Sequence, residues 1–410
     1  MANNNKHTGP NVPALRFPEF SGEWEKVLLG FISDIKTGPF GSTLHADDYV
    51  EEGTPIITTE HFKKGHLPTE KKGLPQVSDD DLKRLKQYSL EENDIVFSRV
   101  GSVDLNARVG KENEGWLFSG RVLRVKLKDF DSRYIHYVLS TQTVRNDIVS
   151  RAVGQTMPSI NTGILSNTSI TIAPSIEEQN KLGRLFEILD ARIIAQSKII
   201  EELKTLRSAL RQRLIYQGSS DRIPLLCFAE LKNGYAFKSN TYTETGNHAI
   251  ITISNVTGER YISTEGCNKI QYIPSDIQDY QILHFGDILI SMTGNVGRVS
   301  MCAKGSYLLN QRVGLLKIKP EYIEFSEFIF QCLRDLSFTN AMKDKGQGAA
   351  QQNIGKGDIE SYEIPWFDDA RYMKSVANLL LEFDNAVLVE EKQYVKYTVQ
   401  KAWLLSKLFI

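Results

Sequence analysis

The stretch Asn93-Asp-Ile-Val-Phe-Ser-Arg-Val-Gly101 occurs a second time 193 residues later, as Gly286-Asp-Ile-Leu-Ile-Ser-Met-Thr-Gly294. Other parts of the two halves match at offsets of 191 to 196 residues: Val27–Gly38 with Ile223–Gly234, Arg121–Lys128 with Arg312–Lys319, Ser159-Ile160 and Gly163 with Asn353-Ile354 and Gly357, and Leu185, Asp190, Leu210 and Leu214 with Leu379, Asp384, Leu404 and Leu408. A spacing that drifts by only five residues over half of the chain predicts one architecture used twice, with small changes in the loops.

Length and composition limit the class of protein. The chain has 410 residues, of which 41% are hydrophobic and 24% charged, so we expect a folded protein with more than one core. Lys plus Arg number 49 and Asp plus Glu 50, which argues against an overall basic coat but allows local basic patches. The opening residues lack the apolar segment of a secretory signal, and no apolar run reaches the length of a membrane span. Cys227, Cys267, Cys302 and Cys332 have no zinc-ligand spacing, so we expect reduced thiols and a cytoplasmic protein that holds no metal.

Each repeat begins with a mixed α+β globule. Short apolar runs rich in β-branched residues predict strands: Pro55–Thr59, Asp94–Ser98, Ser169–Ile172, Ala249–Ile253, Asp287–Ser291 and Glu363-Ile364. Helical stretches are expected at Ser132–Ser150 and Ser326–Lys345.

Each repeat ends in a long helix. Between Ser175 and Tyr216 the chain has no proline, and apolar residues recur in a heptad pattern. The expected seam contains Leu182, Leu189, Gln196, Leu203 and Leu210, then Leu185, Arg192, Ile199 and Leu206, with Phe186, Ile193, Ile200 and Leu214 beside them. Ser175 and Glu178 predict a capping box, and about 40 residues correspond to a helix of roughly 60 Å.

The two long helices are expected to bury their apolar stripes against each other. The result is a pseudo-twofold arrangement in which an antiparallel coiled coil separates two similar globules and fixes the distance between them. The predicted segments are a polar N-terminal extension (1–16), the first globule (17–174), the first helix (175–218), the second globule (219–366) and the second helix (367–410).

Motifs of known catalytic chemistry are not found in the sequence. It contains no GxxxxGK[ST] nucleotide loop, HExxH zinc motif or GxSxG nucleophile motif. His45, Asp47 and Asp48 cluster in a polar segment, which is more typical of a solvated surface than of a metal site. We therefore expect no catalytic residues.

Polar loop segments, in contrast, recur in both repeats. Each has a Lys-x-Gly segment with a nearby aromatic residue, a polar segment after the first strand, a glycine-bearing turn after the Asp-Ile strand, and a late polar loop. Their side chains are of the kinds that contact base edges and phosphates. The candidate DNA-binding residues are Lys36, Phe40, Thr58, Thr59, Ser98, Arg99, Ser102, Arg151, Gln155 and Thr156 in the first repeat, and Lys232, Tyr235, Ser254, Asn255, Thr293, Asn295, Lys345, Gln347, Gln351 and Gln352 in the second.

Two other interpretations are open on these residues alone. The segments are also compatible with ordinary polar loops, and the chain with a coiled-coil scaffold whose globules bind proteins rather than DNA. An enzyme with its own active site is the third class, and the absence of repeated catalytic residues argues against it.

The chain resembles the specificity (S) subunits of type I restriction–modification systems. Ile170-Thr-Ile-Ala-Pro174 followed by Ile176-Glu-Glu-Gln179 is similar to the family's junction between a target-recognition domain and its helix. The Asp-Ile strands of both repeats and the opening Val12–Pro18 with Trp24 also match. The second junction, Ile364-Pro-Trp-Phe-Asp-Asp, lacks the Pro-x-x-x-Glu-Gln pattern, so subunit contacts transfer less directly there.

The resemblance implies a DNA-binding subunit without a catalytic site of its own. Each recognition domain would read one half of a split double-stranded DNA target, and the helices would set the unread gap. The implied partners are two modification (methyltransferase) subunits, which methylate adenine with S-adenosylmethionine, and restriction subunits that supply ATP-dependent translocation and cleavage. S-adenosylmethionine, ATP and Mg²⁺ would then be bound by the partners, and no membrane is involved.

Overall fold

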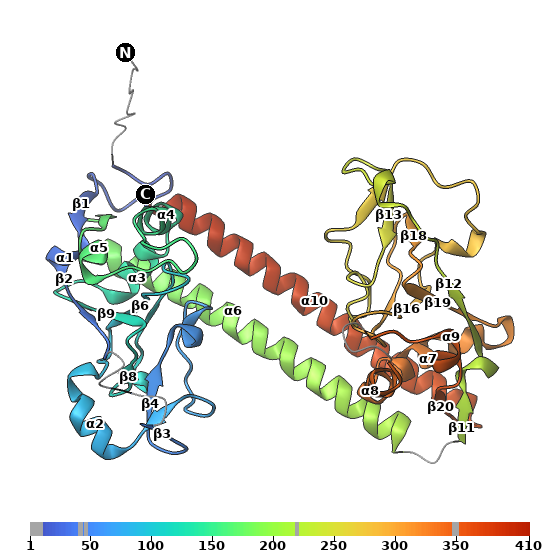
Figure 1. Cartoon of the computed structure of the whole chain (residues 1–410). Coiled ribbons are helices and arrows are strands. Elements are labelled where there is room, and N and C mark those ends of the chain that lie inside the picture. Colours follow the sequence, from blue (N-terminus) through green and yellow to red (C-terminus); the bar gives the residue numbers. More distant parts are fainter. Residues whose placement is uncertain (1–10, 40–43, 45–47, 218–220, 347–351) are drawn as a thin grey trace. The chain divides into compact units, whose positions relative to one another are not determined.

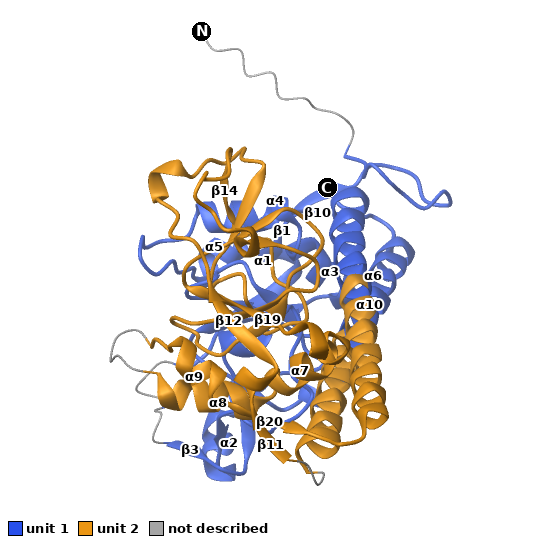
Figure 2. Cartoon of the chain, turned by 90° about the vertical axis from the view of Figure 1, so that its right-hand side faces the viewer, with its two compact units in different colours: residues 1–196, 393–410 blue, residues 197–392 orange. Residues whose placement is uncertain are grey.

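The computed structural model describes residues 11–39, 44, 48–217, 221–346 and 352–410, and the chain divides into two compact units. Unit 1 consists of Met1–Gln196 and Gln393–Ile410, and unit 2 of Ser197–Lys392 (Figure 2). Each unit therefore contains one copy of the globule together with parts of both long helices.

The described residues of the globule of unit 1 form three small sheets. Their strands are β1 (Glu25–Leu28), β2 (Ser33–Thr37), β3 (Tyr49–Val50), β4 (Thr54–Ile57), β5 (Gln76–Val77), β6 (Ile95–Ser98), β7 (Asn106–Arg108), β8 (Leu117–Phe118), β9 (Val122–Leu127) and β10 (Ser169–Ile172) (Figure 1). The sheet orders are β1-β10, β2-β9-β6-β7 and β3-β5-β4-β8, and within the last sheet β4 and β8 run parallel. The helices are α1 (Leu29–Ile32), α2 (Asp79–Leu85), α3 (Ser132–Leu139), α4 (Gln142–Ser150) and α5 (Thr162–Ser166).

Unit 2 repeats this plan. Its strands are β11 (Asp221–Pro224), β12 (Ala229–Asn233), β13 (His248–Ile251), β14 (Asn268–Ile270), β15 (Ile282–Leu283), β16 (Ile288–Ser291), β17 (Val299–Met301), β18 (Tyr307–Leu309), β19 (Val313–Ile318) and β20 (Glu363–Trp366). The orders β11-β20 and β12-β19-β16-β17 correspond to the first two sheets of unit 1, and the third sheet again has one parallel pair, β13 with β18. The helices are α7 (Ser326–Leu333), α8 (Leu336–Lys345) and α9 (Lys356–Glu360).

The predicted helical stretches at Ser132–Ser150 and Ser326–Lys345 are confirmed, and each consists of two helices. Between α3 and α4, Thr141 adopts an extended backbone and its hydroxyl donates to the carbonyl of Val138 (2.8 Å). Between α7 and α8, the Asp335 side chain accepts from the backbone N–H of Ser337 (2.9 Å). Short polar side chains at helix ends satisfy backbone groups that the helix leaves unpaired, which explains both breaks.

The two long helices are α6 (Ile176–Arg211), which continues as a π-helical turn over Gln212–Tyr216, and α10 (Ala370–Leu408). Ser175 caps α6, since its hydroxyl accepts from the N–H of Glu178 (3.2 Å). In a capping box the Glu178 side chain would bond back to the Ser175 backbone. Here the buried Glu178 carboxylate instead accepts two hydrogen bonds of 2.7 Å from Arg16. Arg16 thus ties the predicted N-terminal extension to unit 1.

Within each unit a segment of α6 packs antiparallel to a segment of α10, as predicted. In unit 1 the start of α6 contacts the end of α10, and Arg192 lies over the ring of Tyr397 at 4.5 Å. In unit 2 the end of α6 contacts the start of α10, where the Tyr372 hydroxyl donates to the Leu214 carbonyl (2.8 Å).

The predicted seam of α6 is only partly correct. Leu182, Phe186 and Ile200 are buried, but Ile199 and Leu206 are 43% and 50% exposed. Ile199 and Leu206 point away from the contact between α6 and α10. The reason is that α6 also packs against a globule, so its buried positions do not follow a strict heptad.

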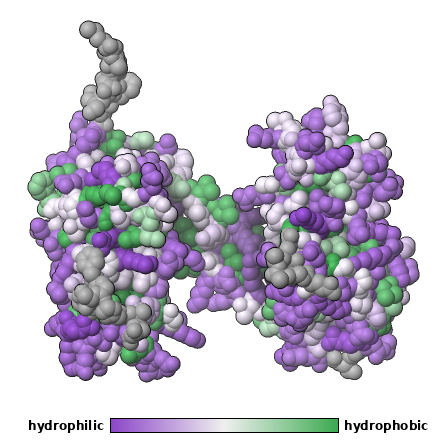
Figure 3. Space-filling view, in the orientation of Figure 1, coloured by the Kyte–Doolittle hydropathy of each residue, from purple (hydrophilic) through white to green (hydrophobic). Residues whose placement is uncertain are grey.

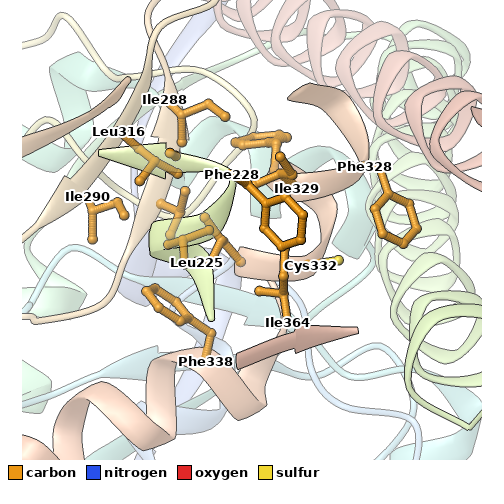
Figure 4. Packing of buried hydrophobic residues seen from close by; sticks show 14 of the residues in the cluster. Leu225, Phe228, Ile288, Ile290, Leu316, Phe328, Ile329, Cys332, Phe338 and Ile364 are labelled. Carbon is orange, nitrogen blue, oxygen red and sulfur yellow. The ribbon is translucent and has the colours of Figure 1, made fainter. Parts of the chain in front are cut away.

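Each unit has its own core. The largest cluster in unit 2 joins the sheet residues Ile288, Ile290 and Leu316 to Phe328 and Ile329 of α7 (Figure 4). Burial of such side chains contributes about 1.5–3 kcal/mol each, which makes this cluster the main stabilising feature of the unit.

The surfaces visible in Figure 3 are mostly hydrophilic, with scattered apolar residues. Among the described residues, no helix is both long and apolar enough to cross a membrane.

Candidate nucleic-acid interface

The glycine-bearing turn and the late loop meet in both units through equivalent backbone bonds. In unit 1 the Gly101 N–H donates to the Pro158 carbonyl (2.8 Å), and the Ile160 N–H donates to the Arg99 carbonyl (2.9 Å). In unit 2 the corresponding bonds are Gly294 to Gln352 (2.8 Å) and Ile354 to Met292 (3.0 Å). Gly101 and Gly294 have φ values of 84° and 72°, a region that favours glycine, so the repeated glycines are needed for this turn.

In unit 1 these loops, together with the polar segment after β4, line two adjoining cavities of about 740 and 240 Å³, which we call the recognition cavity. Both parts of the cavity share Thr59, Glu60, Val100 and Arg121. The remaining lining comprises Pro39, Leu44, Tyr49, Thr58, Arg99, Ser119, Gly120 and Ser159 in the larger part, and Lys63, Ser98, Gly101, Ser102, Leu105 and Met157 in the smaller. Two of the four predicted loop segments therefore line one place, and Pro39 brings a third to its edge. The late loop reaches the cavity through Met157 and Ser159, which follow the predicted segment.

The recognition cavity presents several hydrogen-bond donors. Arg121 is exposed, Lys63 pairs with Glu60 (2.5 Å), and Arg99 donates to the Gly120 carbonyl (2.9 Å). The hydroxyls of Ser98 and Ser119 are buried and have no hydrogen-bond partner in the described part of the chain. Guanidinium, ammonium and hydroxyl groups of this kind suit phosphate oxygens and base edges.

The structure divides the predicted residues of unit 1 into two sets. Thr58, Thr59, Ser98, Arg99 and Ser102 line the recognition cavity, and Gln155 and Thr156 are exposed in the late loop beside it.

Lys36 and Arg151 do not line the recognition cavity. Lys36 lies over the Tyr88 ring and donates to the Gln87 carbonyl (3.0 Å). Arg151 bonds to Asp147 (2.5 Å), the Ile164 carbonyl (2.8 Å) and Thr168 (2.8 Å), which holds the base of the late loop. Phe40 lies outside the described residues.

The predicted residues of unit 2 divide in a similar way. Ser254, Asn295 and Lys345 are exposed, and Gln352 is partly exposed beside the turn. Gln347 and Gln351 lie outside the described residues.

The other four residues of unit 2 make local bonds. Asn255 is buried and accepts from the Thr252 N–H (2.9 Å), and Thr293 forms a β-bridge to Asn353. Tyr235 donates to Asp276 (2.8 Å), and Lys232 pairs with Glu230 (2.7 Å). Asn255 therefore shapes its turn rather than facing outward.

Sequence reasoning missed Arg121 and its repeat equivalent Arg312. Both are exposed, and each carbonyl accepts from the glycine-bearing turn, from Arg99 (3.0 Å) in unit 1 and from Met292 (3.1 Å) in unit 2. The sequence did contain a signal for these two residues, because the aligned stretches Arg121–Lys128 and Arg312–Lys319 both begin with an arginine just before a buried strand.

The aspartate of the Asp-Ile strand has a structural function. Asp94 accepts from the Glu91 N–H (2.9 Å) and Asp287 from the His284 N–H (2.8 Å), so each closes the turn that precedes its strand. Burial raises the pKa of Asp94 to about 6. Among the described residues, no group of three or more His, Cys, Asp or Glu side chains is placed to hold a metal ion.

Comparisons with known proteins agree with this arrangement. The family model "Type I restriction modification DNA specificity domain" matches residues 21–205 and 227–366. A protein of Methanocaldococcus jannaschii, described as a type I restriction enzyme MjaX specificity subunit, is 24% identical over 96% of this chain and 93% of its own length. The crystal structure of a type I restriction–modification S subunit from M. genitalium matches with a TM-score of 0.65 at 16% identity, covering 97% of this chain and 99% of that one. A chain from a structure of complex assembly in a type I restriction–modification system matches with a TM-score of 0.52 at 13% identity, covering 94% and 97%.

Proposed function

Because the chain belongs to the family of type I restriction–modification DNA specificity proteins, we propose that each of its two units reads one half of a bipartite double-stranded DNA target. The observation that carries this proposal is the repeated junction of turn and late loop at the ends of β6 and β16. It supports a pair of equivalent reading surfaces, each built on a rigid strand end.

The recognition cavity and the adjacent late loop form the reading surface of unit 1 in this proposal. Arg121 and Lys63 grip phosphates, while Gln155, Ser102 and Thr59 approach base edges. In unit 2 the corresponding groups are Arg312, Asn295 and Gln352. The two long helices set the length of the unread spacer between the half-sites.

Partners supply the chemistry. We assign methyl transfer from S-adenosylmethionine to two modification subunits, and ATP- and Mg²⁺-dependent translocation and cleavage to restriction subunits, all in the cytoplasm. Exposed apolar residues on the long helices support protein partners: Ile188, Ile194, Val395, Val399 and Trp403 in unit 1, and Ile199, Leu206, Leu379 and Val389 in unit 2. Large apolar side chains grouped on exposed helix faces are typical of interaction sites.

A domain exchange tests the division of labour. Residues 222–366 are replaced by those of a relative with a different target, and the methylated sequence is determined for the assembled complex. One half of the target should change while the other stays. A change in both halves, or in neither, would refute the assignment of one unit to one half-site.

Single substitutions then separate base contacts from phosphate contacts. Gln155→Ala should weaken binding to the cognate half-site by about 1–3 kcal/mol, with little effect on other sequences. Arg121→Ala should weaken binding to all DNA sequences. It should also reduce the magnitude of the slope of the logarithm of the association constant against the logarithm of the salt concentration by about 1. A chain whose DNA affinity did not depend on salt would instead favour the protein-binding scaffold.

A further inference from the structure

Asp190 in unit 1 and Asp384 in unit 2 occupy equivalent positions of the repeat and make equivalent contacts. The Tyr137 hydroxyl donates to Asp190 (2.8 Å), and the Gln331 amide donates to Asp384 (2.9 Å). Lys401 pairs with Asp190, and Arg207 with Asp384, each at 2.5 Å. All four contacting residues follow the same offset of 194, so both aspartates attach the long helices to their globule in the same way.

Unit 2 seals the space beside its aspartate with an arginine of its own. The Arg260 guanidinium donates to Asp384 (3.0 Å) and to Glu327 (2.7 and 2.8 Å), and it lies over the Phe330 ring at 5.5 Å. Arg260 is only 6% exposed and Asp384 only 1% exposed. A second arginine, Arg334, completes the ion cluster at 2.7 Å.

In unit 1 the same place is open. A cavity of about 540 Å³, which we call the Asp190 cavity, is lined by His136 and by Asp190, whose side chain is 26% exposed. Its lining also contains Glu187, which pairs with two further lining residues, Arg108 (2.7 Å) and Arg133 (3.6 Å). The residue at the offset of 194 from Arg260 is His66, which is exposed at the rim. Among the described residues of unit 1, no arginine bonds to Asp190.

His136 offers an acceptor to this cavity. It corresponds to Phe330, is 6% exposed, and its Nδ1 lies 2.6 Å from Asn106 Oδ1. Because the Asn106 amide nitrogen donates to Ser140 (3.2 Å), Oδ1 must accept, and Nδ1 carries the proton. Nε2 is therefore an unprotonated acceptor, and no described residue bonds to it. Burial lowers the pKa of His136 to about 3, so the ring stays neutral.

We infer that the Asp190 cavity receives an arginine side chain from the modification subunit that docks on unit 1. Unit 2 shows that a guanidinium fits beside the equivalent aspartate, Asp384. The cavity of unit 1 offers an incoming guanidinium the Asp190 carboxylate and the neutral His136 imidazole, while Glu187 is already paired. Ile194 at the cavity and Ile188 on the same helix are 42% and 57% exposed, which supplies apolar contact for a protein rather than a small cation. This inference rests on the proposed function, since it names one contact of a proposed partner.

The inference is tested by filling the cavity in the full-length chain. His66→Arg places a guanidinium where unit 2 has Arg260, and Ala191→Gln fills the cavity from α6 without a change of charge. Thr143→Arg, at an exposed position of α4 outside the cavity, is the matched control for added charge. Each variant is mixed with the purified modification subunit, and stoichiometry and affinity are measured by native mass spectrometry and titration calorimetry.

We expect the wild-type chain and Thr143→Arg to bind two modification subunits. His66→Arg and Ala191→Gln should each weaken one of the two sites at least tenfold, with DNA binding by the chain alone unchanged. Wild-type affinity at both sites in the two filled variants would overturn the inference and leave the proposed function intact. A wild-type chain that bound DNA but no modification subunit would refute the proposed partner and the inference together. N-acetyl-arginine amide is a direct probe of the cavity. It should compete with the modification subunit and weaken binding at one of the two sites, whereas the uncharged citrulline analogue should not.

Discussion

Replacing Asp384 by asparagine should destabilise unit 2 far more than the equivalent change, Asp190→Asn, destabilises unit 1. Asp384 is 1% exposed and holds the guanidinium groups of Arg207, Arg260 and Arg334 at 2.5 to 3.0 Å. Removing its charge leaves the three guanidinium groups without the carboxylate they share, and breaking a buried ion cluster in this way costs about 3–5 kcal/mol.

The pKa of Asp384 shows the same stabilisation of its charged form. Burial acts to raise this pKa, but the surrounding arginines outweigh burial and hold it at about 2, below the ordinary 3.8. At 1.36 kcal/mol per pKa unit, the charged form contributes about 2 kcal/mol. Because the folded pKa is the lower one, this contribution is present above pH 3.8 and is lost as the pH falls toward 2. The asparagine variant should therefore lower the free energy of unfolding of unit 2 by about 3–5 kcal/mol and also lose this part of its acid dependence.

Asp190 is the matched control. Its pair with Lys401 is about one-quarter exposed on each side chain, so Asp190→Asn should cost about 1 kcal/mol. Hydrogen exchange of the amides in α7 reports the stability of unit 2, and that of α3 reports unit 1, in the same full-length chain. Equal losses in the two units, within 1 kcal/mol, would refute the view that the arginine cluster makes Asp384 a stronger attachment than Asp190.

Further predictions concern unit 1. Burial lowers the pKa of His136 from 6.5 to about 3, so the unfolded state takes up a proton at a higher pH than the folded state does. The free energy of unfolding of unit 1 should therefore fall by up to about 1.4 kcal/mol for each pH unit below 6.5. His136→Phe introduces the residue found at this position in the second repeat and should make the stability of unit 1 depend less on pH, as measured by hydrogen exchange of α3 between pH 7 and 5. An unchanged pH dependence would show that His136 is not its cause. Phe409 is 6% exposed and its ring lies 5.4 to 6.1 Å from those of Trp24, Tyr134 and Phe186. Phe409→Ala should therefore lower the free energy of unfolding of unit 1 by about 3–5 kcal/mol in urea titrations, whereas a loss below 1 kcal/mol would show that the end of α10 is not part of that core.

The repeat made the fold predictable from sequence. Nearly equal offsets of 191 to 196 residues along the chain predicted two similar globules and two long helices, because a duplicated sequence folds twice in the same way. Helix breaks at Thr141 and Asp335 were missed, since a single polar residue within an apolar periodic stretch is a weak signal. The exposure of Ile199 and Leu206 was missed because periodicity alone does not show that α6 faces a globule as well as another helix.

The candidate site was predictable as a set of loops but not residue by residue. Thr59, Ser98 and Ser102 line the recognition cavity, as polar residues in repeated loops can be expected to do. Arg151 belongs to the same pattern by composition, yet three bonds to its own unit hold it in place. Whether an arginine faces a ligand or ties down a loop depends on which acceptors the fold places beside it, and sequence does not show that.

The two aspartates explain how a duplicated protein can keep its fold and still present different surfaces. The contacts that attach the helices are kept in both units. Asp190 accepts from Tyr137 and Lys401 in unit 1, and Asp384 accepts from Gln331 and Arg207 in unit 2. The positions around them differ in a concerted way, since unit 2 combines Arg260 with Phe330 while unit 1 has His66 and His136. A guanidinium over a phenyl ring closes the space in unit 2, and a neutral imidazole beside a carboxylate that is about one-quarter exposed leaves the space in unit 1 able to accept a donor. Two identical partner subunits would therefore meet two different receptors, and their affinities for the two units should differ even though the backbone plan is the same.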